Sequence, residues 1–224
     1  MNIGMSLAVL SGVLWTIVYI DSIRIGIKDK TYAMPLWALG LNIAWEFLYF
    51  TLGYKAAGLV GQVVINGVWF ILDIGLVYTF FRYGRKYFPK NLKPNWFYGW
   101  GILVLVVTFI VQYAFILEFE GMMAAAYSAF LQNLLMSVLF IGMLVKRGSS
   151  EGQTMLIAVS KFIGSLAPTI SIGIMGSAPY SEPNSFVLII GILMVIFDLV
   201  YIWMLAGIRE KEKREKTQKN WVEG

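Results

Sequence analysis

The sequence predicts an all-α protein that folds as a bundle of seven membrane-spanning helices. Of its 224 residues, 58% are hydrophobic and only 14% are charged, and the mean hydropathy is +0.71. A soluble domain carries about 25% charged residues. The charged residues also gather in short segments between long apolar runs, and one helical crossing needs about 20 apolar residues. Little of the chain is therefore expected outside the bilayer.

The first three predicted spans are separated by short connections. Ile3–Ile23 has neither a basic start nor a small-residue cleavage signal, so it is expected to be a retained helix rather than a signal peptide. Pro35–Tyr54 and Leu59–Phe81 follow, and each contains a single charged residue, Glu46 and Asp73 respectively. Each run is about as long as one helical crossing requires.

Four more apolar runs complete the predicted bundle. They are Trp96–Leu117, Met122–Val145, Thr154–Gly176 and Phe186–Ile208. The fourth span opens with Trp96, Tyr98 and Trp100, aromatic residues typical of a membrane interface. Because the connections are short, residues 1–208 are predicted to form one membrane domain. Residues 209–224 begin with alternating basic and acidic residues and are expected to form a charged cytosolic tail.

The basic residues predict the orientation of the bundle. Lys161 lies inside a span, and every other Lys or Arg except Lys55 lies in the first, third or fifth connection or in the tail. Lys and Arg accumulate on the cytosolic side of membrane proteins, so the N-terminus is predicted outside and the C-terminus in the cytosol. This alternation requires an odd number of spans. It also accounts for the net charge of +5 without a nucleic-acid partner.

Two absent residue types exclude several kinds of site. The chain has no Cys, which excludes thiolate nucleophiles, iron–sulfur clusters and cysteine zinc sites. It has no His, which excludes a Ser-His-Asp triad and a histidine proton switch. The phosphate-binding pattern G-x-x-x-x-G-K-[ST] is absent as well. No metal site and no cofactor are predicted.

Apart from Asp21 at the cytosolic rim of the first span, four ionisable residues lie inside the predicted spans. They are Glu46, Asp73, Lys161 and Asp198. An ionised group at bilayer depth is costly, and such groups usually face the bundle interior and mark a functional site. At about 1.5 Å per residue, all four lie roughly 10–17 Å from the cytosolic ends of their spans. Their similar depth on four separate helices predicts one shared site.

The neighbours of the acidic residues extend this predicted site. Asn42, Glu46 and Tyr49 share one helix face, since side chains four and three residues apart lie on the same side. The predicted catalytic residues are Glu46, Asp73 and Asp198. The predicted substrate-binding residues are Asn42, Trp45, Tyr49, Asn66, Trp69, Lys161 and Tyr201. Further polar lining is expected from Gln112, Tyr113, Tyr127, Gln132 and Asn133.

A structural role is the alternative for some of these residues. Side-chain amides in membrane helices also hold neighbouring helices together through hydrogen bonds, which applies equally to Asn42, Asn66, Gln132 and Asn133. Lys161 is more simply explained as the partner of a carboxylate than as a nucleophile. Three acidic residues with one Lys are harder to explain in this way.

Buried carboxyls and aromatic rings together suggest acid chemistry on an apolar molecule. A carboxyl in an apolar cavity can stay protonated at neutral pH and act as a general acid. Aromatic rings stabilise a nearby cation through their quadrupole. This combination suits a reaction that makes carbocations from a lipid-like substrate. The same groups would also serve as the relay of a proton-coupled transporter.

The segment Asn42-Ile-Ala-Trp45-Glu46-Phe-Leu-Tyr49 resembles the N-x-x-W-E-x-x-Y signature of small integral-membrane terpene cyclases. These enzymes occur in fungal meroterpenoid and indole-diterpene pathways and have bacterial relatives. Trp69–Tyr78 is similar to the family's third helix, and Asp198-Leu-Val-Tyr201 to the acidic motif of its last helix. The number of spans and the length agree, so the resemblance covers essentially the whole chain.

The resemblance implies a cyclase without a metal cofactor, and the soluble-cyclase signatures D-D-x-x-D and D-x-D-D are indeed absent. A carboxylic acid would protonate a terminal epoxide or alkene of a prenylated or linear isoprenoid substrate, and cationic ring closure would follow. Glu46 would be the proton donor, Asp198 would share the proton or orient the substrate, and Asp73 would support them. Lys161 matches no family motif. If it paired with Glu46, that carboxyl would ionise and could not donate.

The resemblance also implies partners and a location. The substrate would be hydrophobic and prenylated, and an upstream prenyltransferase or epoxidase would supply it. The protein would lie in the endoplasmic reticulum if fungal and in the cell membrane if bacterial. A proton-coupled transporter remains the alternative. A retinal protein is disfavoured because the last span has no Lys, and a receptor because of the buried acidic residues.

Overall fold

The computed structural model describes residues 3–177 and 180–223, and within them the chain is helical and contains no strand. The long α-helices of this part are α1 (Ile3–Lys28), α2 (Leu36–Ala57), α3 (Gly61–Tyr83), α4 (Pro94–Glu118), α5 (Gly121–Arg147), α6 (Met155–Pro168) and α7 (Ser185–Glu223). A 3-10 helix, η1 (Gly84–Tyr87), follows α3, and a π-helix, η2 (Thr169–Ile174), follows α6. The prediction of an all-α bundle of seven helices is confirmed.

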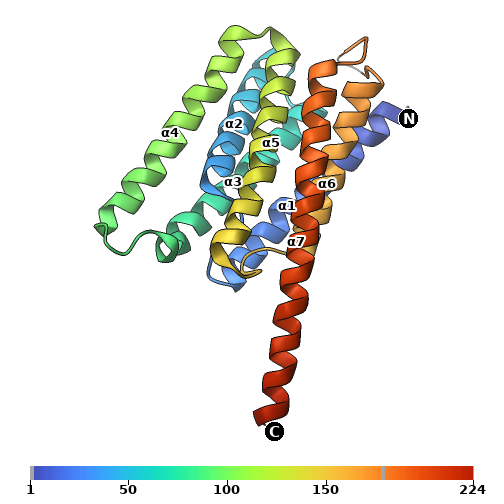
Figure 1. Ribbon diagram of the computed structural model, residues 1–224. Coiled ribbons are helices and arrows are strands. Elements are labelled where there is room, and N and C mark those ends of the chain that lie inside the picture. The colour runs from blue at the N-terminus through green and yellow to red at the C-terminus, as the bar shows by residue number, and fades with distance from the viewer. Residues whose placement is uncertain (1–2, 178–179, 224) are drawn as a thin grey trace.

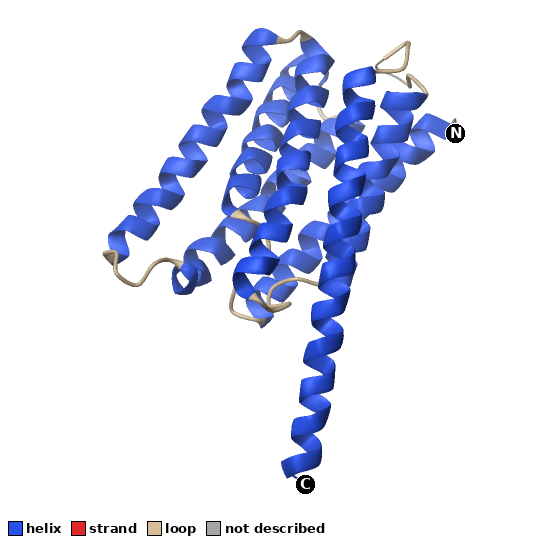
Figure 2. Cartoon of the chain, in the orientation of Figure 1, coloured by secondary structure: helices blue, strands red, loops and turns tan. Residues whose placement is uncertain are grey.

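The helices run alternately up and down and are joined by short loops (Figure 1, Figure 2). α2 packs against α3, α4 and α5, while α1 packs against α3 and α6. α7 packs against α5 and α6, and its C-terminal part projects beyond the bundle (Figure 1). The loops predicted to be cytosolic therefore lie at the same end of the bundle as the C-terminal tail.

Six helices of the described residues are long and apolar enough to cross a membrane, and α2 is the long helix that falls outside this set. Its 22 residues suffice in length at about 1.5 Å per residue, but Asn42 and Glu46 lower its hydropathy. Both side chains are buried against the neighbouring helices. The long helix outside this set is thus the one that carries Glu46, the predicted proton donor.

The outer surface of the bundle is more apolar than the surface of a soluble protein. Ile71, Ile110 and Trp203 are 66%, 60% and 76% exposed, whereas many polar side chains are buried. Large apolar patches on a soluble monomer are rare, but lipid-facing helices have this pattern. The chain is a multi-pass membrane protein.

Two helices differ in detail from the predicted spans. The span predicted over Thr154–Gly176 changes from α- to π-helix after Pro168, because proline lacks the N–H that would continue the ladder and its ring crowds the preceding turn. α7 continues without a break into the charged residues 209–223. Pairs such as Glu210–Arg214, at 2.5 Å, stabilise this extension one turn apart.

Arg147 joins three connections at the predicted cytosolic end. Its guanidinium donates to the backbone oxygens of Glu151 (2.7 Å) and Tyr32 (2.9 Å) and lies over the rings of Tyr32 and Tyr87 at 4.5 and 4.4 Å. The Glu151 carboxylate accepts from Lys86 Nζ and the Tyr87 hydroxyl. Burial raises the pKa of Glu151, but these hydrogen bonds outweigh it and hold the pKa below its usual value.

We expect Arg147→Lys to lower the free energy of unfolding by about 1–3 kcal/mol, since lysine cannot bond two carbonyls and stack on two rings at once. The matched control is Arg214→Lys, because Arg214 forms an exposed pair in the tail. Thermal unfolding of both variants in detergent measures the difference. Equal midpoints for the two variants would contradict the role assigned to Arg147.

Candidate active site

Glu46 on α2 and Asp73 on α3 form a buried pair of carboxyls in the bundle interior. Their residues are 1% and 0% exposed. The side-chain amide of Asn42 donates to Glu46 Oε1 at 3.1 Å and to Asp73 Oδ2 at 2.9 Å. The hydroxyl of Tyr19, on α1, donates to Glu46 Oε1 as well. Three helices thus bring their polar groups to one point.

Two glutamines fix the orientation of Asn42. Gln132 on α5 donates to the Asn42 oxygen at 3.2 Å, and Gln112 on α4 donates to the Gln132 oxygen at 2.5 Å. All three amides are buried. With its oxygen occupied in this way, Asn42 must direct its N–H groups toward the acidic residues. Helices α1 to α5 all contribute to this network.

No cation balances this carboxyl pair within the described residues. None of the ion pairs there includes Glu46 or Asp73. Glu46 Oε2 and Asp73 Oδ1 accept no hydrogen bond from an amide or hydroxyl group of those residues. Two adjacent carboxylates without a cation cannot both stay ionised in a low-dielectric interior. One proton held by the pair is the arrangement that its surroundings favour.

Lys161 and Asp198 form a second, separate centre between α6 and α7. Lys161 Nζ lies 2.7 Å from Asp198 Oδ1 and donates to the Ser137 hydroxyl on α5 at 2.7 Å. Both charged side chains are almost fully buried. The four ionisable residues divide into two hydrogen-bonded clusters, and that both clusters line one site stays a prediction. Lys161 forms its ion pair with Asp198 and not with Glu46, so it does not favour ionisation of Glu46.

The predicted aromatic residues lie in different surroundings. Trp69 stacks on Tyr19, with ring centroids 5.9 Å apart, and donates to Thr16 at 3.0 Å. It therefore lies beside the carboxyl pair. Trp45 donates to the backbone oxygen of Ala125 on α5 at 3.0 Å, and its ring lies 4.8 Å from that of Tyr49.

Other predicted residues have partners away from the acidic side chains. Asn66 accepts from Gln62 at 2.8 Å, and the Tyr201 hydroxyl donates to Gln153, in the α5–α6 loop, at 3.0 Å. The suggestion that Tyr113 adds polar lining is wrong, since it lies on the outer surface at 48% exposure.

The remaining residues suggested as lining are bound in pairs. Asn133 donates to Ser165 at 2.8 Å, and Tyr127 accepts from Asn184 at 3.1 Å. Asn133 thus links α5 to α6, and neither pair includes a carboxyl group.

Sequence reasoning missed Tyr19 and Ser137. Both contact an ionisable group directly. Trp15, Tyr19 and Ser22 recur at four- and three-residue spacing in the first span, which is a helical stripe and the one signal that could have identified Tyr19. Ser137 carries no comparable signal. Within the described residues no group of three or more His, Cys, Asp and Glu side chains is placed to hold a metal ion.

The fold and the site together define a multi-pass membrane protein with a buried acid centre. Residues 1–211 match the family of Pyr4-like transmembrane terpene cyclases, and the chain belongs to this family. It is an enzyme of the terpene cyclase type, and the predicted resemblance is confirmed.

Named fungal relatives support this assignment. The Pyr4-family terpene cyclase mfmH of Annulohypoxylon moriforme is 31% identical over 215 residues, which cover 93% of this chain and 88% of the relative. Terpene cyclase pyr4 of Aspergillus fumigatus is 27% identical over 213 residues, with the same coverage. Terpene cyclase macJ of Penicillium terrestre is 32% identical over 170 residues, or 70% of this chain and 62% of the relative. No solved structure matches the chain.

Removing one member of the Lys161–Asp198 pair should destabilise the protein far more than removing both. We expect Lys161→Met alone to cost about 3–5 kcal/mol, because it leaves an unpaired charge buried, whereas the double variant Lys161→Met/Asp198→Leu should regain most of this loss. Unfolding of the two single variants and the double variant in detergent gives the coupling energy. Additive losses would show that the two side chains do not depend on each other.

Proposed function

We propose that this cyclase starts its reaction by protonating a terminal epoxide or alkene of a prenylated or linear isoprenoid substrate, without a metal ion. The observation that carries the proposal is the buried carboxyl pair of Glu46 and Asp73, which forms no ion pair with any cation in the described part of the chain. Family membership supports the general reaction, and the pair supports this way of starting it. We therefore expect the enzyme to cyclise its substrate in the presence of a strong chelator.

Glu46 is the proposed proton donor. It lies in the N-x-x-W-E-x-x-Y segment. Its Oε1 accepts hydrogen bonds from Tyr19 and Asn42, whereas its Oε2 accepts none from either residue. The proton passes from the carboxyl group to the epoxide oxygen or the alkene carbon. A neighbouring double bond then supplies the electron pair that closes the ring, and a carboxylate remains. Asp73 shares the proton with Glu46 before the transfer; afterwards both groups are carboxylates, and the substrate cation beside them supplies the opposite charge.

Asp198 has a different proposed part. Its charge is fixed by Lys161, and its Oδ2 accepts no hydrogen bond within the described residues. Sharing the initial proton with Glu46 therefore fits Asp198 less well than beginning the reaction as the anion of its pair with Lys161. Such an anion can stabilise the cationic intermediate and accept the proton that the final cation loses as its last double bond forms. The product is then an isomer of the substrate, and the proton on Asp198 has to return to the Glu46–Asp73 pair, by way of solvent, before the next turnover.

The substrate-binding surface is proposed to be aromatic. The ring of Trp69 lies beside Tyr19, and the rings of Trp45 and Tyr49 lie together toward α5. Aromatic faces attract a cation within about 6 Å of the ring centroid, which suits a carbocation moving along a prenyl chain. Asn42 positions the acidic residues, whereas Asn66, Tyr201 and Lys161 are proposed to shape the site from its edges through their neighbours.

The cellular setting follows from the proposed substrate. A hydrophobic prenylated molecule would reach the site from the bilayer, after an upstream prenyltransferase and, for an epoxide, an epoxidase have acted. Because the relatives named above are fungal, the endoplasmic reticulum is the proposed membrane. A bacterial host would place the same protein in the cell membrane.

Glu46→Gln should lower cyclisation of a prenylated test substrate by about 10²–10⁴-fold, the usual effect of losing a general acid. Asp198→Asn should lower it as well, and the matched control is Glu118→Gln, since Glu118 is exposed at the end of α4. The measurement is product formation by membranes that contain equal amounts of each variant.

Full activity of both Glu46→Gln and Asp198→Asn would refute the proposed mechanism. If no isoprenoid reacts and proteoliposomes instead show an acid-dependent solute flux that Glu46→Gln abolishes, the transporter alternative is correct.

A further inference from the structure

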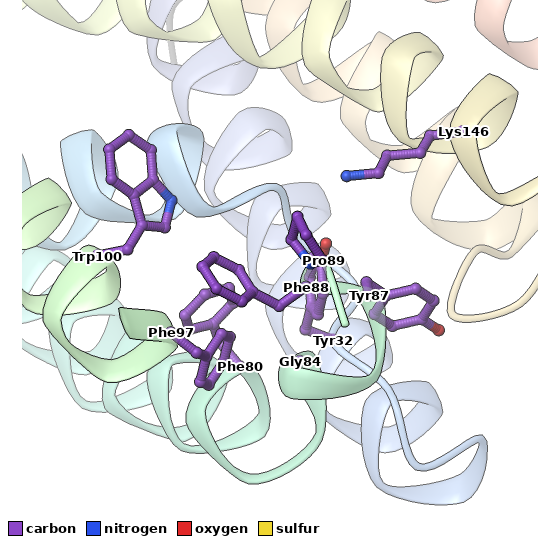
Figure 3. A pocket seen from close by; sticks show the side chains of 9 residues that line it. All are labelled: Tyr32, Phe80, Gly84, Tyr87, Phe88, Pro89, Phe97, Trp100 and Lys146. Atoms are coloured by element: carbon purple, nitrogen blue, oxygen red, sulfur yellow. The ribbon is translucent and has the colours of Figure 1, made fainter. Parts of the chain in front are cut away.

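An aromatic hollow of about 220 Å³ lies at the predicted cytosolic end of the bundle (Figure 3). Its walls come from the α1–α2 connection, the end of α3, η1 and the start of α4, with one residue from α5. The aromatic residues that line it are Tyr32, Phe80, Tyr87, Phe88, Phe97 and Trp100. None of the groups assigned to catalysis lines this hollow.

The rings around the hollow are fixed by contacts with one another. Phe80 stacks on Phe97 with centroids 5.1 Å apart, and Tyr32 meets Phe80 edge-on at 5.3 Å. The floor is Gly84, where a Cβ atom would come within 3.2 Å of both Phe97 and Tyr32. Arg147 holds Tyr32 on another side. The hollow is therefore a built feature of this end of the fold.

Three basic residues that form no ion pair within the described residues line this hollow and a second one beside it. Lys146 extends from α5 toward the aromatic side chains (Figure 3). A second hollow of about 180 Å³ shares the Phe88–Pro89 wall and is lined by Arg85 and Lys90. No acidic residue lines either hollow, and none of the ion pairs of the described residues includes these three cations. The charge and the aromatic walls together fit a ligand that is both anionic and apolar.

The depth of the hollow indicates where that ligand comes from. Trp96 and Tyr98, at the start of α4 beside the hollow, are 64% and 43% exposed. Exposed Trp and Tyr at a helix end are typical of the headgroup region. This end also carries most of the basic residues, and anionic lipids are concentrated in the cytosolic leaflet. A ligand at this depth would lie among the lipid headgroups.

We propose that the two hollows form a binding site for the phosphate headgroup of an anionic phospholipid. Lys146, Arg85 and Lys90 contact the phosphate, and the aromatic hollow receives the adjoining glycerol and upper acyl segments. Basic pockets between helices at the cytosolic face bind lipid headgroups in this way. The site lies outside the acid centres, so the proposal stands independently of the proposed reaction.

The test is titration of the purified full chain in detergent with short-chain phosphatidylserine, followed by native mass spectrometry. The variant Lys90→Ala/Lys146→Ala should weaken binding at least about fivefold, since each basic residue near a lipid surface contributes measurably. The matched control is Lys213→Ala/Lys216→Ala, which removes the same charge from the exposed tail. Circular dichroism shows whether both variants keep their helices.

Equal weakening by both double variants, or by neither, would overturn the proposal. So would binding of phosphatidylcholine as tight as that of phosphatidylserine. A parallel titration with farnesyl diphosphate distinguishes the source of the phosphate. If farnesyl diphosphate binds in a Lys146-dependent manner and phosphatidylserine does not, the site takes an isoprenyl phosphate and the lipid assignment is wrong.

Discussion

The pairing of Lys161 with Asp198 is the interaction on which the rest of the site depends. Lys161 is the single basic residue inside the predicted spans, and its Nζ lies 2.7 Å from Asp198 Oδ1. Had it reached Glu46 or Asp73 instead, a cation there would have favoured two carboxylates. Because Lys161 pairs with Asp198, Glu46 and Asp73 lie together without a counterion among the residues that the structure describes. A proton held between them lowers the cost of burying their charge.

Helix α5 contacts both hydrogen-bonded clusters. Gln132 and Ser137 lie on neighbouring turns of α5, and the first belongs to the carboxyl network while the second bonds Lys161. A shift of α5 would therefore disturb both centres at once. The buried amides of Gln112 and Gln132 orient Asn42 through their hydrogen bonds, which is a structural function. Polar links and acid chemistry thus occur in the same network.

Much of the fold could be predicted from the sequence, and less of the site. Apolar run length sets the spans, and helical spacing places Asn42 beside Glu46. Helical periodicity gives the face and the depth of a side chain, but it does not say which helix packs opposite. The pairing of Lys161 with Asp198 could therefore not be predicted. Tyr19 was missed because none of the four ionisable residues of the predicted site lies in its span. The change of α6 at Pro168 was missed because hydropathy does not report backbone geometry.

The central claim is that Glu46 and Asp73 hold one proton between them at neutral pH. Infrared spectroscopy of the purified protein measures this directly, because a protonated carboxyl absorbs separately from a carboxylate. The account predicts a protonated-carboxyl band at pH 7 that disappears in Glu46→Gln and persists in Asp198→Asn. Absence of the band from the unaltered protein, or its persistence in Glu46→Gln and in Asp73→Asn, would contradict the account.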